Sequence, residues 1–387
     1  MNRKWSSPAA PWPRYEQDEI DAVERVLRSG KVNYWTGEEG RLFEQEFAAA
    51  SGCAYGIALA NGTIALELAL RTLGIGPGDE VITTARTFIA SASCAALVGA
   101  RPVLVDVDRV SQNLTAETIA PAITERTRAI IAVHLNGWPC DMEPILALAA
   151  SRGIAIIEDC SQAHGATYKG RPVGSMGAIG TFSFCQDKIM TTGGEGGMAI
   201  TNDAALQARI WALKDHGKSM GPSGAGGGRH DSFGSNGRMT EMQAAIGRVQ
   251  LRKLPEWVAA RQRNAAVLDA ALKDLRGLRL TIPPAESAHA YYRYTVFVEQ
   301  SQLRQGWSRD RIVAAISDAG VPCFSWSNGD LSLEKAFAAF PQPDLPVARE
   351  LSETSVIFLV HPTFTESDMH SIAHVVRSVM KQDRHSS

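Results

Sequence analysis

The chain contains, at residues 181–197, the stretch TFSFCQDKIMTTGGEGG. An aromatic strand is expected to end at Ser183, Lys188 follows five residues later, and a run of glycines follows the lysine. A surface lysine does not need this setting. A lysine that binds an aldehyde covalently does, because it needs a fixed approach, close backbone packing and a nearby anion site. The stretch therefore indicates a reactive lysine just beyond a strand.

The stretch IIEDCSQAHG at residues 156–165 supplies the other half of the pattern. It is typical of a buried strand that ends in a carboxylate, here Asp159. A charge at that position is partly desolvated and favours a cationic partner. A strand-end aspartate is by itself more often a helix cap than a cofactor ligand. Asp159 therefore points to a cofactor only in combination with Lys188.

Composition excludes several classes of protein. The 387 residues include 45% hydrophobic and 21% charged residues, with a net charge of -2, and they suffice for a large domain plus a smaller one. No basic stripe favours nucleic acid, and no apolar run is long enough for a membrane span. The six cysteines and nine histidines lack metal-ligand spacing, so no metal is expected. Without a signal-peptide pattern, we predict a cytoplasmic protein.

Alternation of strands and helices decides the fold class. Apolar strands are predicted at residues 55–59, 80–83, 102–107, 129–133 and 154–158, with helices between most of them. This order predicts an α/β protein with a mostly parallel sheet and helices on both faces. Ligands of such sheets bind beyond the carboxyl ends of the strands, which is where Gly62, Thr63, Asp159 and Ser183 fall.

The last third of the chain predicts a second domain. Residues 217–236 are rich in glycine and predict a flexible surface segment. A long helix is expected over residues 240–272, with Pro255 as a candidate break. We place the domain change in this helix. The large domain is then 14–252, and the smaller C-terminal α+β domain is 253–387.

Pyridoxal 5′-phosphate matches these residues. It needs a lysine for covalent attachment, a carboxylate at its pyridine nitrogen and an anion site for its phosphate. Lys188 and Asp159 meet the first two needs. Gly62 and Thr63 open a helix after a strand, and Ser183 adds a hydroxyl, so these three meet the third.

Two further residues complete the predicted cofactor site. Phe88 follows the strand at 80–83, where its ring can stack on the cofactor, and Gln162 lies three residues past Asp159. Each residue taken alone is more simply interpreted as a helix cap or a core residue. The order of the whole set along the chain is what indicates the cofactor. A nicotinamide enzyme is disfavoured, because the glycines at 74–78 follow a helix and precede a strand.

Together these residues resemble the DegT-type nucleotide-sugar aminotransferases, which have fold type I of the pyridoxal-phosphate enzymes, in the aspartate aminotransferase superfamily. The resemblance covers nearly the whole chain. It rests on LRSG at 27–30, NGTIAL at 61–66, GDEVI at 78–82, VHLNG at 133–137, the segment at 158–165, FSF with Lys188, and RMTEMQAAIG at 238–247.

The resemblance implies an activity and an assembly. It implies amino transfer, usually from glutamate, to a keto group of a UDP-, dTDP- or GDP-sugar in amino-sugar and surface polysaccharide biosynthesis. It also implies a homodimer with shared active sites, in which Asn236 reaches the cofactor phosphate of the other subunit. Tyr34, Trp35, Arg229 and Trp326 are our candidates for substrate contacts.

Two alternatives remain open at this point. Some members of the family carry a histidine in place of the lysine and perform dehydration with the same cofactor, whereas Lys188 favours amino transfer. A non-catalytic regulatory homologue could keep the fold. The sugar is left open, because the loop CFSWSNG at 323–329 and Gly237 depart from common family patterns.

Overall fold

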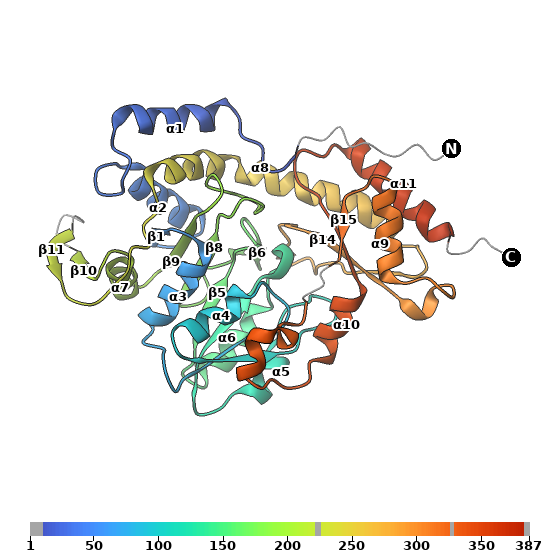
Figure 1. Ribbon diagram of the computed structural model, residues 1–387, viewed down its shortest axis with the longest axis horizontal. Coiled ribbons are helices and arrows are strands. Elements are labelled where there is room, and N and C mark those ends of the chain that lie inside the picture. The colour runs from blue at the N-terminus through green and yellow to red at the C-terminus, as the bar shows by residue number, and fades with distance from the viewer. Residues whose placement is uncertain (1–10, 221–225, 326–328, 383–387) are drawn as a thin grey trace.

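The fold was examined in a computed structural model, which describes residues 11–220, 226–325 and 329–382 (Figure 1). A seven-stranded sheet forms the centre of the large domain, in the order β1-β9-β8-β5-β4-β2-β3. Only β9 is antiparallel to its neighbours, so the predicted mostly parallel sheet is confirmed. The strands are β1 (Tyr55–Leu59), β2 (Glu80–Thr84), β3 (Arg101–Val105), β4 (Thr127–Val133), β5 (Ala155–Asp159), β8 (Ile179–Ser183) and β9 (Gly197–Thr201).

Helices bury both faces of this sheet. Along β4, Ile130 and Ala132 pack in one apolar cluster, and Ile131 and Val133 pack in another on the opposite face. Such two-sided burial is typical of parallel sheets. The helices are α2 (Glu39–Ala50), α3 (Gly62–Thr72), α4 (Ala90–Leu97), the short α5 (Ala116–Ile119), α6 (Met142–Ala150) and α7 (Ala204–Lys214).

One long helix, α8 (Glu241–Leu272), joins the two parts of the molecule. It begins at a capping box formed by Thr240 and Gln243, and it continues through Pro255, so the predicted break there is wrong. Figure 1 shows its first half under α1 (Gln17–Ser29) and its second half beside α11 (Glu366–Gln382). The domain boundary that we place at 252/253 therefore falls inside a continuous helix and stays a prediction.

The smaller domain is built on an antiparallel sheet in the order β12-β14-β16-β15. Its core includes Leu268 and Leu272 of α8, Ile312 of α9 and Ile372 of α11. A helix from the same part of the chain, α10, packs back on the large domain, where Leu351 joins the core of the β2–β3 edge. The bounds are β12 (Leu278–Leu280), β14 (Tyr294–Val298), β15 (Cys323–Phe324), β16 (Ser355–Phe358), α9 (Arg309–Asp318) and α10 (Pro346–Thr354).

The described part of the glycine-rich segment is partly regular. It includes two antiparallel strands, β10 (Lys218–Met220) and β11 (Gly226–His230), and residues 229–236 are exposed, as expected of a surface segment. This hairpin projects from the edge of the large domain beyond α7 (Figure 1). The sequence pattern did not predict these strands, because backbone hydrogen bonds hold them together and glycines provide no side-chain alternation. A three-stranded sheet, β13 (Ser287–Ala288), β6 (Thr167–Tyr168) and β7 (Arg171–Pro172), completes the fold.

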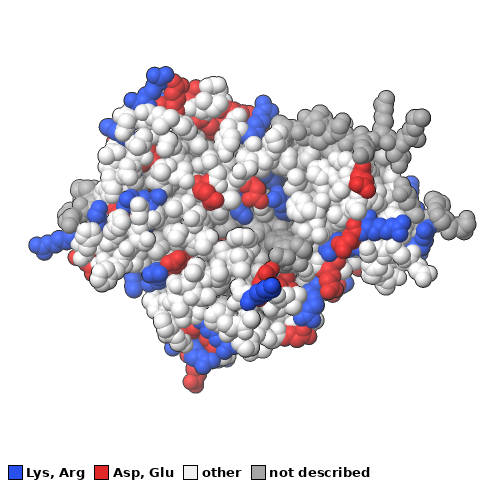
Figure 2. Space-filling view, in the orientation of Figure 1, with Lys and Arg blue, Asp and Glu red and all other residues white. Residues whose placement is uncertain are grey.

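The surface carries no dominant charge on the face shown in Figure 2, where lysine and arginine alternate with aspartate and glutamate. This agrees with the net charge of -2. Within the described ranges, no helix combines the length and apolar character that a membrane crossing requires.

Candidate active site

A cavity of about 890 Å³ opens at the carboxyl ends of β5 and β8, against the start of the smaller domain. Parallel sheets place the residues that follow their strands at this edge, so segments far apart in the sequence meet there. Seven of the predicted cofactor residues line the cavity: Gly62, Thr63, Phe88, Asp159, Gln162, Ser183 and Lys188.

The N-terminus of α3 forms one end of the cavity. Asn61 caps the helix, and its side chain accepts a hydrogen bond from the Ile64 N–H at 2.9 Å. A Cβ atom on Gly62 would lie 2.6 Å from the Cβ of Ser183, so only glycine lets the helix start this close to β8. The N–H groups of the first turn and the hydroxyls of Thr63 and Ser183 thus converge on one space, which suits a phosphate.

Asp159 supplies a fixed carboxylate at the end of β5. Its side chain is 4% exposed. One oxygen accepts a hydrogen bond from the Ser91 hydroxyl at 2.7 Å, and the other accepts one from the Ser161 N–H at 3.0 Å. These donors fix the direction of the carboxylate. A protonated pyridine nitrogen is a suitable partner for it.

A buried network fixes the strand end that carries Asp159. Glu158 Oε2 lies 3.0 Å from His134 Nε2, which donates because His134 Nδ1 already accepts the Cys140 N–H. Burial by itself raises the pKa of Glu158, but His134 and backbone N–H groups hold that pKa below its ordinary value. The N–H groups of Gly174, Met176 and Gly177 occupy the remaining positions on the carboxylate, which leaves no lone pair for a metal ion.

Lys188 is held at both its backbone and its side chain. Its carbonyl accepts a hydrogen bond from the Trp12 indole at 2.8 Å, and its Nζ lies 4.8 Å from the centre of the Tyr292 ring. Burial lowers the pKa of Lys188, while Asp187 and Asp159 act in the opposite direction. A lowered pKa increases the fraction of neutral amine, the form that attacks an aldehyde.

Phe88 and Gln162 lie on the remaining sides. The Phe88 side chain is 62% exposed although it lines the cavity, so its ring is free to stack on a flat group. Gln162 is 5% exposed, and its Oε1 accepts the Asn136 N–H at 2.9 Å. That hydrogen bond fixes the direction of the amide.

Tyr34 and Trp35, which we predicted to contact the substrate, lie outside the cavity lining. Tyr34 is 3% exposed. Its hydroxyl donates to Glu44 at 3.0 Å and accepts from the Trp211 indole at 3.2 Å. Trp35 packs edge-on against the same Trp211. The hydroxyl of Tyr34 is thus already engaged with Glu44 and Trp211, and its contact with the substrate stays a prediction.

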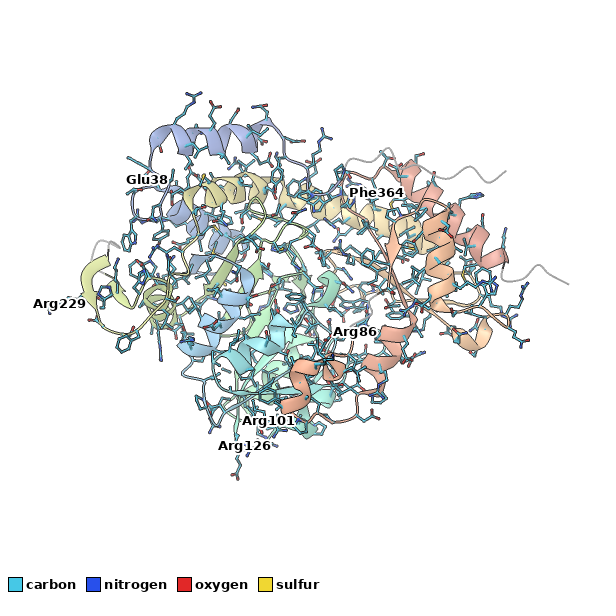
Figure 3. The ribbon with its side chains drawn as sticks, viewed as in Figure 1. Glu38, Arg86, Arg101, Arg126, Arg229 and Phe364 are labelled. Atoms are coloured by element: carbon cyan, nitrogen blue, oxygen red, sulfur yellow. The ribbon has the colours of Figure 1, made fainter. Side chains whose placement is uncertain are left out.

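The residues predicted on or after the glycine-rich segment also lie away from the cavity of their own chain. Arg229 is exposed on β11 and projects outward at the edge of the molecule (Figure 3). Asn236 is exposed and forms an isolated bridge with Asp215. Neither residue lines the cavity. Trp326 falls outside the described residues.

The sequence did not single out several residues that line the cavity: Ser91, Asp187, Glu195, Tyr292, Arg293 and Phe324. Asp187 and Glu195 lie within the stretch around Lys188, and a closer reading of its charges could have found them. Nothing local marks Arg293, which precedes an ordinary apolar strand.

The observed arrangement fits pyridoxal 5′-phosphate. The ends of the cavity provide an anion site at α3 and a carboxylate at Asp159, with an amine at Lys188 and an exposed ring at Phe88. A sheet of this topology with a smaller C-terminal domain, this lysine and this carboxylate is the arrangement of a pyridoxal-phosphate enzyme of fold type I.

Comparison with known proteins agrees with this class and narrows it. Residues 13–377 match the model of the DegT/DnrJ/EryC1/StrS aminotransferase family. The chain belongs to this family and is an aminotransferase that uses pyridoxal 5′-phosphate.

Individual relatives match over almost their whole length. A UDP-N-acetyl-3-dehydro-α-D-glucosamine 3-aminotransferase from Acidithiobacillus ferrooxidans is 40% identical over 90% of both chains. A GDP-perosamine synthase from Caulobacter vibrioides is 38% identical over 95% of this chain and 97% of its own. The crystal structure of an aminotransferase from Psychrobacter cryohalolentis is 51% identical, with a TM-score of 0.93 over 98% of this chain and 100% of that one.

Proposed function

We propose that the protein transfers an amino group from glutamate to a keto group of a nucleotide-activated sugar, in the cytoplasm. The observation that carries the proposal is Lys188, a half-buried lysine at the wall of a cavity that is also lined by Asp159 and the start of α3. The names of relatives that act on UDP- and GDP-linked sugars support the substrate class. The product would be an amino sugar for a surface polysaccharide or a glycosylated metabolite.

Several residues that line the cavity have separate roles in this reaction. The cofactor, when bound, supplies an aldehyde and an electron-accepting ring. Lys188 would bind the aldehyde and, when its amine is free, would move the proton at the substrate carbon. Asp159 would be the partner of the protonated ring nitrogen, and Ser183 with the first turn of α3 would hold the phosphate. Phe88 would cover one face of the ring.

A homodimer with shared active sites is part of the proposal. Asn236 and Arg229 lie at the exposed edge of the large domain, away from the cavity of their own chain. Phe233, between them, is 99% exposed, and such a ring favours cover by a second protein surface. In the proposed dimer, Asn236 reaches the cofactor phosphate of the other subunit.

The test is a pair of half-reactions. The purified protein, loaded with cofactor, is first mixed with glutamate, and the cofactor spectrum and 2-oxoglutarate are followed. UDP-, GDP- and dTDP-linked keto-sugars are then added one at a time, and the product is identified by mass spectrometry. We expect one keto-sugar to restore the starting spectrum and to gain an amine.

Two other results would contradict the proposal. A dehydratase would release a deoxygenated sugar and would not regenerate the amine form of the cofactor from glutamate. A regulatory homologue would give no spectral change with any amino donor.

A further inference from the structure

Arg293 is a second cation in the cavity. It follows Tyr292 just before β14, and its side chain is 16% exposed. Among the described residues that line the cavity, Lys188 and Arg293 are the only lysine or arginine. In the proposed function, Lys188 would bind the cofactor aldehyde. Arg293 is therefore the group in this lining that can neutralise an anionic part of a substrate.

The guanidinium of Arg293 is held by one ion pair, one hydrogen bond that its Nη2 donates to the Tyr292 hydroxyl at 3.2 Å, and two rings. Its Nη2 donates to Asp187 Oδ2 at 2.8 Å, and the Tyr292 hydroxyl donates to the same carboxylate oxygen. Its Cζ lies 4.2 Å from the centre of the Tyr292 ring and 5.5 Å from that of Phe324. Stacking fixes the plane of the guanidinium while its edge stays able to exchange partners.

Arg293 is near enough to Lys188 to hold the far end of an amino acid. Lys188 Nζ and Arg293 Cζ lie 4.8 Å and 4.2 Å from the same point, the centre of the Tyr292 ring, so at most about 9 Å separates them. The side-chain carboxylate of glutamate lies about 5 Å from its amine. A hydrogen bond adds about 3 Å. Such a donor can span from the reacting amine to the guanidinium.

The surroundings favour a carboxylate over a diphosphate. Burial by itself raises the pKa of Asp187, but Lys188, Tyr292 and Arg293 hold that pKa below its ordinary value, so Asp187 is a fixed negative charge. A singly charged carboxylate is repelled less by this neighbour than a pyrophosphate is. Asp187 also keeps the Tyr292 hydroxyl if Arg293 turns to a ligand.

We propose that Arg293 binds a carboxylate of the amino donor, and that Asp187 holds the guanidinium whenever that carboxylate is absent. The inference rests on the proposed function, in which one cavity must accept an anionic amino acid and then the neutral ring of a keto-sugar. A guanidinium that exchanges between Asp187 and the donor satisfies both substrates, because the pair with Asp187 removes its charge from the cavity during the sugar half-reaction.

The experiment compares two kinds of probe on the holoenzyme. Maleate, a dicarboxylate without an amine, and the nucleoside diphosphates UDP, GDP and dTDP are titrated by calorimetry into wild type, Arg293→Gln and Arg293→Lys. Arg311→Gln is the matched control, since Arg311 also stacks on a ring, that of Trp307, but lies outside the cavity. The glutamate half-reaction is followed in parallel by cofactor absorbance.

We expect Arg293→Gln to raise the Kd for maleate and the KM for glutamate by about 10- to 100-fold, the effect of losing one charge-assisted pair. Arg293→Lys should lie between that variant and wild type. The Kd values for nucleoside diphosphates should stay within about twofold, which also shows that the variant is folded. Asp187→Asn should lower the Kd for maleate, because it removes the competing carboxylate.

Two results would overturn the inference. If Arg293→Gln raises the Kd values of the nucleoside diphosphates and leaves that of maleate unchanged, Arg293 binds phosphate. If the substitution changes neither the Kd values of the two kinds of probe nor the KM for glutamate, Arg293 has no binding role. Failure of the proposed function looks different: wild type would bind maleate through Arg293 but leave the cofactor spectrum unchanged with glutamate, and the carboxylate site would stand.

Discussion

The two walls of the cavity are built in different ways. On the large-domain wall, Asp159 and Ser183 are fixed at strand ends, and buried hydrogen bonds hold Asp159 in one direction. On the wall next to the smaller domain, Arg293 is held by stacking and one exchangeable ion pair, and Phe324 is 37% exposed. The difference teaches that the first wall is organised to hold one cofactor, whereas the second can adapt to two successive substrates.

Lys188→Ala should have the largest effect and tests the first wall. Loss of the amine that binds the aldehyde and moves the proton should lower kcat by about 100- to 10,000-fold. Both half-reactions should fall together, because Lys188 acts in each. Stopped-flow absorbance measures them, with the exposed Lys31→Ala as the control. Loss of only the sugar half-reaction would break the distinction between the two walls.

Asp159→Asn should have the second-largest effect on the rates of the half-reactions. Without the charge, the ring nitrogen loses its buried partner, and both half-reactions should slow by about 100- to 1,000-fold. Asp203→Asn is the control, since Asp203 is also a carboxylate that follows a strand of the same sheet, β9, but caps α7 at the surface. An unchanged rate in Asp159→Asn would remove Asp159 from the cofactor site.

Glu158→Gln should change stability more than chemistry. The amide cannot accept four hydrogen bonds, and the free energy of unfolding at about pH 7 should fall by about 1–3 kcal/mol. Because the pKa of folded Glu158 lies below its ordinary value of 4.5, its contribution is present above that value and is lost as pH falls through the folded pKa. Urea titrations should show the gap between variant and wild type narrowing in acid. A gap that widened in acid would contradict the charged network.

Trp12→Phe should have the smallest effect. It removes the indole N–H that donates to the Lys188 carbonyl but keeps a ring against Trp257 and Arg261. We expect a loss of about 1 kcal/mol in the free energy of unfolding, with the glutamate KM unchanged. Trp257→Phe is the control. A raised KM for glutamate would place Trp12 in the donor site. The cofactor wall would then also bind the donor, against the distinction drawn between the two walls.

Sequence patterns predicted the large-domain wall well, and physical reasons explain this. Asp159 ends an apolar strand and Gly62 opens a helix, and both features are local. Parallel topology then brings all such strand ends to one edge of the sheet. The positions of these residues in space followed from their positions on elements.

The second wall was not predictable in this way. The place of Arg293 depends on how α8 carries the chain from one domain to the other, and no local pattern records that path. The burial of Tyr34 was not predictable for a related reason. Its partners, Glu44 and Lys214, lie on α2 and α7, and only packing shows that they enclose the ring.

The central claim is that Lys188 is the residue that binds the cofactor. The most direct measurement is reduction of the loaded protein with borohydride, followed by peptide mapping by mass spectrometry. The account predicts that the added mass of the cofactor lies on Lys188 alone. Attachment to another lysine, such as the fully buried Lys214, or no attachment at all, would contradict it.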